Sequence, residues 1–225
     1  MEPVKLIIDG REVRASSTMT VLQAALAAEM YIPHLCFDPL LKAQGGCRLC
    51  LVEIKGMRGL PASCVTTVAE GMEVTTNGPE LEHVRRDTLE LILADHPDNC
   101  LTCVKKQACQ LQKVAGYLGM TTRRVEALRA GRGIDTSNPV FDIDRDYCVL
   151  CQRCVRACNE LVHADVISVM QRGPDSRIGM FIEPAEMLPV CGPCKICLDH
   201  CPVAALSLKN ENNHPAHPQV KCPPR

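Results

Sequence analysis

The stretches 148-CVLCQRCVRAC-158 and 191-CGPCKICLDHCP-202 share one cysteine spacing: two intervals of two residues, then one of three. Residues 159–190 separate the two runs. Thiolates are ligands for soft metals, and structural zinc sites pair two short cysteine motifs instead of placing three cysteines at steps of three. The repeat therefore predicts metal clusters held by thiolates as the organising feature of this part of the chain.

The spacing is that of two-cluster ferredoxins, in which the last cysteine of each run ligates the cluster of the other run. On this rule one [4Fe-4S] cluster has the ligands Cys148, Cys151, Cys154 and Cys201. The second has the ligands Cys158, Cys191, Cys194 and Cys197. Asn159 follows the first run, whereas Pro202 follows the second. This difference leaves the turn after Cys158 unpredicted, but it does not change the predicted ligands.

A third group of potential ligands follows a predicted helix that starts at Pro79 and ends at the His96–Pro97 pair. A histidine beside a proline at a helix end is, taken alone, more often a surface or capping residue. Three cysteines close by lack a fourth ligand, however, so the histidine completes a [4Fe-4S] site made of His96, Cys100, Cys103 and Cys109. A neutral imidazole makes this cluster less negative, which favours its reduced form.

The first group of cysteines places three on one irregular segment and a fourth later in the chain, which is the arrangement of plant-type [2Fe-2S] sites. Its members are Cys36, Cys47, Cys50 and Cys64. Gly45 and Gly46 allow the backbone to approach a cluster and to direct amide N–H groups at its sulfides. A zinc site is the alternative, because two cysteines separated by two residues are common to both metals.

The segment before these cysteines predicts a small mixed sheet with one helix. Residues 4–8 and 11–15 are expected to form a hairpin, because Asp9-Gly10 is a strong turn signal. Thr20 caps a helix that continues to Glu29, since apolar residues recur there at helical spacing. Residues 51–55 and 72–76 are expected to be further strands.

Composition limits the class of protein. The 225 residues contain 16 cysteines, but no secretory leader or membrane span is visible, so a reducing, cytoplasmic setting is expected. The net charge of −1 gives no support for nucleic-acid binding, and no glycine-rich phosphate-binding motif predicts a flavin, NAD or ATP site. Residues 210–225 form a polar, proline-rich tail, expected to be disordered, in which Cys222 belongs to no group.

The order of these groups resembles the N-terminal iron-sulfur part of the NADH:quinone oxidoreductase large subunit, of [FeFe]-hydrogenases and NAD-linked formate dehydrogenases, and the diaphorase small subunit of NAD-reducing hydrogenases. The stretch 46-GCRLCLVE-53 is typical of that family. The resemblance implies an α+β protein with a β-grasp domain at 1–77, a one-histidine cluster domain at 78–135, a two-cluster domain at 136–209 and a tail at 210–225. With one [2Fe-2S] and three [4Fe-4S] clusters, 14 iron atoms are expected per chain.

The resemblance implies that the chain transfers electrons and has no catalytic site of its own. Single electrons would pass between a flavin- and NAD(P)-binding diaphorase subunit and a catalytic subunit of hydrogenase type, or alternatively of formate dehydrogenase, bifurcating or reductase type. Two further alternatives stay open: a free, ferredoxin-like carrier, and a zinc-binding structural protein.

Overall fold

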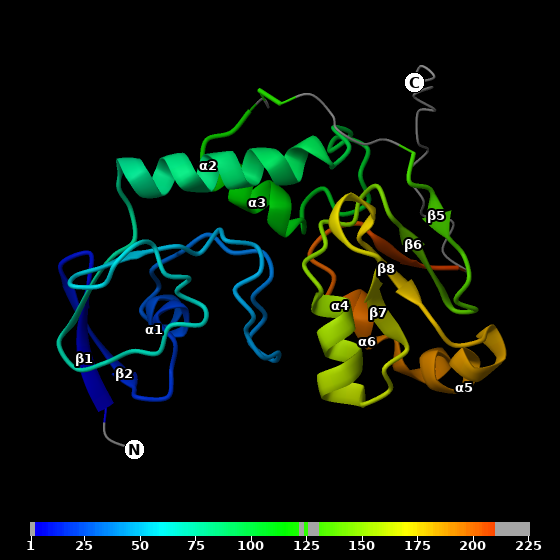
Figure 1. Ribbon diagram of the computed structural model, residues 1–225, viewed down its shortest axis with the longest axis horizontal. Coiled ribbons are helices and arrows are strands. Elements are labelled where there is room, and N and C mark those ends of the chain that lie inside the picture. Colours follow the sequence, from blue (N-terminus) through cyan, green and yellow to red (C-terminus); the bar gives the residue numbers. More distant parts are fainter. Residues whose placement is uncertain (1–2, 122–123, 126–130, 210–225) are drawn as a thin grey trace. The chain divides into compact units, whose positions relative to one another are not determined.

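A computed structural model describes residues 3–121, 124–125 and 131–209 (Figure 1). Contacts divide the chain into two compact units, which are described separately. Unit 1 comprises Met1–Phe37, Ala43–Leu89 and Val114–Thr121, and unit 2 comprises Asp38–Lys42, Glu90–Lys113 and Thr122–Arg225. The three-domain division stays a prediction, and the tail with Cys222 lies outside the described residues.

Unit 1 contains a four-stranded mixed sheet in the order β2-β1-β4-β3. The strands are β1 (Pro3–Ile8), β2 (Arg11–Ser16), β3 (Glu53–Ile54) and β4 (Met72–Thr75). β1 pairs antiparallel with β2 and parallel with β4. Asp9 and Gly10 have φ of 49° and 79°, the left-handed values that a two-residue hairpin turn requires. The predicted hairpin is confirmed, whereas the strand expected at 51–55 is only two residues long.

Helix α1 (Val21–Ala27) packs its apolar side against this sheet and begins as the sequence predicts. The Thr20 hydroxyl accepts from the Gln23 amide, while the Gln23 side chain accepts from the Thr20 amide at 2.9 Å. This reciprocal capping box satisfies two amides at the start of the helix. Leu22 of the helix and Ile8 of the sheet are completely buried, so the core of unit 1 is aliphatic.

Two longer helices follow: α2 (Pro79–Ala94) and α3 (Gln110–Tyr117). Near its start, α2 sends Arg85 into the core of unit 1, where the side chain is 1% exposed. Its guanidinium donates to the carbonyl oxygens of Thr76 and Leu51, so it satisfies two backbone acceptors with one side chain. Burial lowers the pKa of Arg85 from its ordinary value. Among the described residues, no helix is both long enough and apolar enough to cross a membrane.

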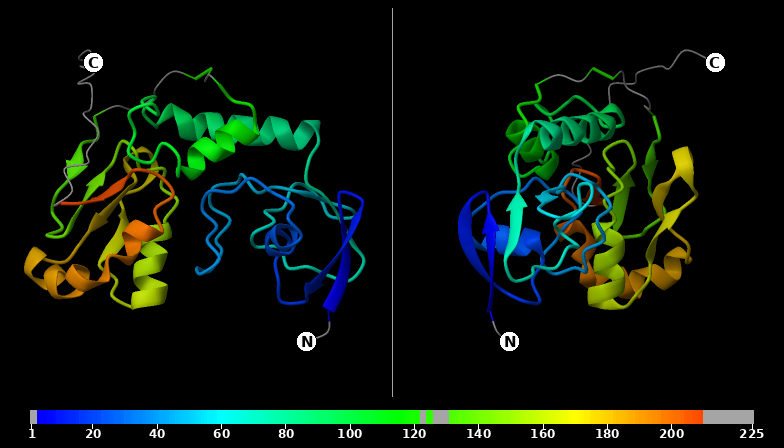
Figure 2. Two further views of the ribbon diagram at one scale, coloured as in Figure 1. Left: turned by 180° about the vertical axis from the view of Figure 1, so that it is seen from behind. Right: turned by 60° about the vertical axis from the view of Figure 1, so that its left-hand side comes forward.

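Unit 2 is built from short elements. A three-stranded sheet has the order β5-β6-β9, and β7 pairs antiparallel with β8. The strands are β5 (Ile134–Asp135), β6 (Phe141–Asp144), β7 (Ile167–Met170), β8 (Arg177–Met180) and β9 (Leu206–Leu208). The helices are α4 (Arg153–Arg156), the π-helix η1 (Ala157–Val162), the 3-10 helix η2 (Gly173–Asp175), α5 (Pro184–Cys194) and α6 (Ile196–Asp199). Helices α4 and α6 lie side by side (Figures 1 and 2).

Candidate iron-sulfur sites

The two cysteine runs of unit 2 have the same local geometry. Gln152 and Lys195 each follow the second cysteine of a run and have φ of 59° and 51°. Each is the N-cap of a short helix, α4 or α6, that carries the third cysteine of its run. The left-handed residue turns the backbone sharply between the second and third cysteines, so all three can face one point. The repeat seen in the sequence is therefore also a repeat in structure.

One cavity of unit 2 is lined by branched apolar side chains, among them Ile143 and Ile178, and by four thiols from both runs. The thiols are those of Cys148, Cys151, Cys154 and Cys201. A second cavity is lined by Phe141, Ile167 and another four thiols. These are the thiols of Cys158, Cys191, Cys194 and Cys197. The structure thus brings together both sets that the spacing predicts, with the fourth cysteines exchanged between runs, while ligation itself stays a prediction.

Electrostatics in these two cavities agree with bound clusters. Burial raises the pKa of Cys148 to about 11 and those of Cys151 and Cys197 to about 12. Cluster ligation requires thiolates, which an apolar cavity destabilises unless a cation compensates them. The iron of a cluster supplies that charge, so the donor set fits the predicted group.

The third predicted set lines a further cavity of unit 2, formed after the end of α2. Its members are His96, Cys100, Cys103 and Cys109. His96 is 9% exposed, and its Nδ1 lies 3.1 Å from the Pro97 carbonyl oxygen. Because a carbonyl can only accept, Nδ1 carries the proton in this contact and Nε2 keeps the lone pair that a metal needs. A backbone partner of this kind is typical of metal-ligating histidines.

The thiols of the first predicted set interact with one another in unit 1. The Cys47 amide donates to the Cys36 sulfur at 3.4 Å. The Cys64 thiol donates to the sulfur of Cys50, which lowers the pKa of Cys50 to about 7, and the same contact raises the pKa of Cys64. Gly45, with φ of 66°, also directs its amide at Cys64. Cys36 also acts electrostatically on Cys50 and Cys64, so the four thiols lie close together, while amide contacts to cluster sulfides stay a prediction.

Among the described residues, no three histidine, cysteine or carboxylate side chains form a site for a single metal ion. The thiols of the three predicted [4Fe-4S] sets line cavities.

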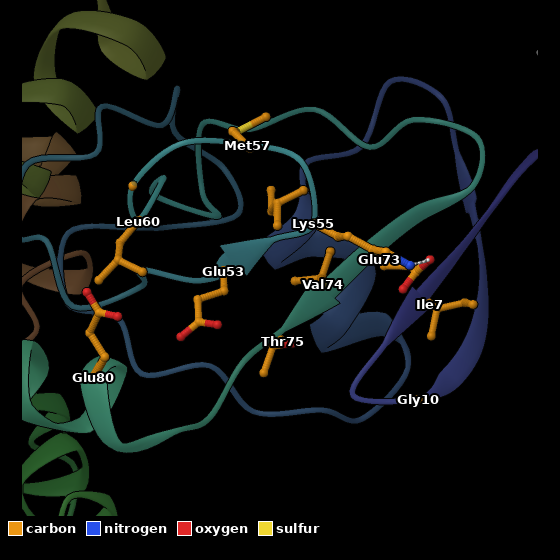
Figure 3. A pocket seen from close by; sticks show the side chains of 12 residues that line it. Ile7, Gly10, Glu53, Lys55, Met57, Leu60, Glu73, Val74, Thr75 and Glu80 are labelled. Carbon is orange, nitrogen blue, oxygen red and sulfur yellow. Dashed lines mark hydrogen bonds and ion pairs between the residues drawn. The ribbon is translucent and has the colours of Figure 1, made fainter.

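A separate hollow lies on unit 1 beside β3 and β4, away from the predicted ligands (Figure 3). Its lining includes Ile7, Met57 and Glu80, and Lys55 is ion-paired with Glu73 at 2.7 Å. No cysteine or histidine lines it. It therefore has no thiolate or imidazole ligand for an iron-sulfur cluster.

Three polar or aromatic contacts beside the cysteines were not predicted. His200 Nδ1 lies 2.8 Å from Asp38 Oδ2, and the Lys105 ammonium donates to the Cys201 carbonyl at 2.7 Å. Tyr147, completely buried beside Cys148, meets the His96 ring edge to face at 5.5 Å. These partners are far apart in sequence, so no local spacing pattern identifies them.

Family descriptions match three parts of the chain. Residues 1–79 match a 2Fe-2S iron-sulfur cluster binding domain, and residues 85–124 match the NADH-ubiquinone oxidoreductase-G iron-sulfur binding region. Residues 138–207 match the ferredoxin-like domain of NADH-quinone oxidoreductase subunit 3.

Curated relatives are much longer than this chain. The second NADH-quinone oxidoreductase-G protein of Rhizobium meliloti is 36% identical over 205 residues, covering 90% of this chain and 24% of that protein. The NADP-reducing hydrogenase subunit HndD of Solidesulfovibrio fructosivorans is 32% identical over 211 residues, covering 92% of this chain and 36% of that protein. The chain thus spans about a quarter to a third of the curated relatives it matches.

A solved structure matches over nearly its whole length. It is a chain in the crystal structure of an NAD+-reducing [NiFe]-hydrogenase in the H2-reduced state, with 33% identity and a TM-score of 0.83. The match covers 92% of this chain and 88% of that chain. The expected α+β architecture, with a [2Fe-2S] ferredoxin domain and [4Fe-4S] domains, is confirmed. The chain belongs to the family of iron-sulfur subunits related to NADH-quinone oxidoreductase-G and NAD-reducing hydrogenase.

Proposed function

We propose that the chain is an electron-relay subunit that carries one [2Fe-2S] and three [4Fe-4S] clusters on the four predicted ligand sets. The observation that carries this proposal is the exchange of Cys158 and Cys201 between the two cavities of unit 2. Structural zinc sites pair two short cysteine motifs, whereas the exchange of the fourth cysteine between two runs is the arrangement of two-cluster ferredoxins.

Shared cavity walls support stepwise transfer of single electrons. Ala204 lines the His96 cavity, while its neighbours Val203 and Ala205 line the cavity that contains Cys201. The next boundary is equally thin, because α4 and η1 carry Cys154 into one cavity and Cys158 into the next. The three cavities of unit 2 are therefore lined in succession by residues that are neighbours in the sequence.

The clusters when bound would supply the redox chemistry, and the chain's own residues would set the reduction potential of each cluster. His96 contributes a neutral ligand where the other sites have thiolates, which makes its cluster easier to reduce. Apolar side chains such as Ile143 and Phe141 exclude water from the two cysteine-only sites. Amides such as that of Gly45 stabilise negative sulfur.

The host we propose is a cytoplasmic NAD(P)-linked hydrogenase complex, in which a flavin-bearing diaphorase subunit exchanges electrons with a hydrogenase subunit through this chain. The 33% sequence identity and the TM-score of 0.83 to a chain of an NAD+-reducing [NiFe]-hydrogenase support this host. A reductase-type complex is the second candidate, because the NADPH-Fe(3+) oxidoreductase subunit alpha of Geobacter sulfurreducens is 32% identical over 92% of this chain.

Anaerobic purification from the native host tests both parts of the proposal. Iron and acid-labile sulfide are expected at about 14 of each per chain, and zinc without sulfide would overturn the cluster assignment. A flavoprotein and a hydrogenase subunit are expected to co-purify in fixed proportion. Elution of the cluster-loaded chain as a monomer would contradict the complex and leave a free carrier.

A further inference from the structure

The segment 201–205 is the wall between two proposed cluster sites in unit 2. Cys201, Val203 and Ala205 line the cavity of the cysteine-only site, and Ala204 lines the His96 cavity. The Cys201 sulfur lies 3.1 Å from the Val203 carbonyl oxygen, so this segment is tightly turned. A residue that fixes this segment therefore holds the protein layer between the two sites.

Lys105 is such a residue, and it comes from the far side of the wall. It lies between Cys103 and Cys109 of the His96 set, yet its ammonium reaches the Cys201 carbonyl oxygen at 2.7 Å. Nearby, the Gln110 amide donates to the Pro202 carbonyl at 3.0 Å. The two bonds join the loop of one site to the cysteine ligand of the next.

Lys105 differs from two arginines of the same unit in the partner of its charged group. Arg132 is paired with Asp95 at 2.9 Å, and Arg145 with Asp135 at 2.6 Å. Lys105 forms no ion pair with any carboxylate in the part of the chain that the structure describes, and its partner is a neutral carbonyl. The Lys105 ammonium is therefore held by a neutral partner beside the backbone of a predicted cluster ligand.

We propose that Lys105 is a positioning residue that raises the reduction potential of the cluster ligated by Cys201 and holds the wall between the two sites. This inference rests on the proposed function. Reduction adds one negative charge to a cluster, and a fixed cation nearby in a medium of low dielectric constant stabilises the reduced state. The carbonyl bond keeps the ammonium in place, so the effect does not depend on a mobile surface charge.

The test is an EPR-monitored redox titration of the full, cluster-loaded chain under anaerobic conditions. Lys105→Met keeps the length of the side chain but removes the charge, and Lys105→Arg keeps the charge. Lys113→Met removes an equal charge from an exposed position on α3 and is the matched control. We expect Lys105→Met to lower the ratio of reduced to oxidised cluster about tenfold at a fixed potential for one cubane, with Lys105→Arg and Lys113→Met close to the parent.

His96→Cys identifies the affected cubane, because it changes the signal of the histidine-ligated cluster. The signal shifted by Lys105→Met is expected to be a different one. The proposal is overturned if no midpoint moves in Lys105→Met, if the shifted signal is that of the His96 cluster, or if Lys113→Met produces the same shift. If one cluster is lost in Lys105→Met but kept in Lys105→Arg, this supports the role of Lys105 in holding the segment 201–205. If that cluster is lost in both variants, the proposed role of the positive charge is overturned. Absence of cubane signals from the parent chain would instead refute the proposed function.

Discussion

The buried pair Asp38–His200 holds the segment 38–42 within unit 2. Both residues are 8% exposed, and Asp38 Oδ2 lies 2.8 Å from His200 Nδ1. Burial acts to raise the pKa of Asp38, but hydrogen bonds from His200 and the Leu40 amide outweigh it and hold that pKa below its ordinary value. The carboxylate is therefore charged at neutral pH. At the other end of the segment, the Lys42 amide donates to Glu160 Oε2 at 2.7 Å.

Asp38→Ala removes the acceptor and leaves the buried imidazole N–H of His200 unsatisfied. A hydrogen bond to a charged group contributes about 1.5–3 kcal/mol, and we expect a loss of about 2 kcal/mol in the free energy of opening this segment. Since about 1.4 kcal/mol corresponds to a factor of ten, the open state should become about thirtyfold more populated. Asp38→Asn keeps a carbonyl acceptor and should recover most of this loss.

Hydrogen exchange of the cluster-loaded chain, followed by mass spectrometry, measures the change. The Lys42 amide is the reporter, because its acceptor is Glu160 and is still present in the variant. Its exchange should be about thirtyfold faster in Asp38→Ala. Asp175→Ala removes an exposed aspartate of the same unit and should leave the rate unchanged. A rate in Asp38→Ala within about threefold of the parent would refute the reasoning.

Three other changes give separate expectations. His96→Cys adds a thiolate and should lower the midpoint potential of one cubane in a redox titration; an unchanged midpoint would show that His96 is not a ligand. Arg85→Met leaves the buried carbonyls of Thr76 and Leu51 without a donor and should cost about 2 kcal/mol in denaturant unfolding; a cost below about 0.5 kcal/mol would contradict that role. Removal of the clusters by chelation should increase hydrogen exchange in β6 and β9 far more than in β1 and β2, and equal increases would contradict a structural role of the clusters in unit 2.

Elements with a local signal were predictable from the sequence. The Asp9-Gly10 turn, the Thr20 cap and the helix stop at His96–Pro97 each depend on residues within a few positions of one another, and all three are present. The grouping of the cysteines was predictable for the same reason. Its spacing is set by the backbone turn that each run must make around one cavity.

The strands of unit 2 had no comparable signal. β6 has the sequence Phe-Asp-Ile-Asp, whose alternation indicates one buried and one exposed face, yet all four residues are buried. Asp142 and Asp144 are covered by other parts of the unit instead of facing solvent. Two-residue to four-residue strands are too short for periodicity to be recognised. Contacts such as Lys105–Cys201, 96 residues apart, depend on the assembled fold.

The exchange of Cys158 and Cys201 between the two cavities also ties the two cysteine runs together in folding. Helices α4 and α6 have four residues each, far fewer than an isolated helix needs in water. The apolar cluster around them counts Cys154, Cys158, Cys191 and Cys197 among its buried members, so the predicted ligands are part of the core. Neither run can complete its site without the other, because Cys158 and Cys201 lie in each other's cavities. Unit 2 should therefore acquire its two cysteine-only clusters and its tertiary structure together, and a variant lacking either exchanged cysteine should lose order around both cavities.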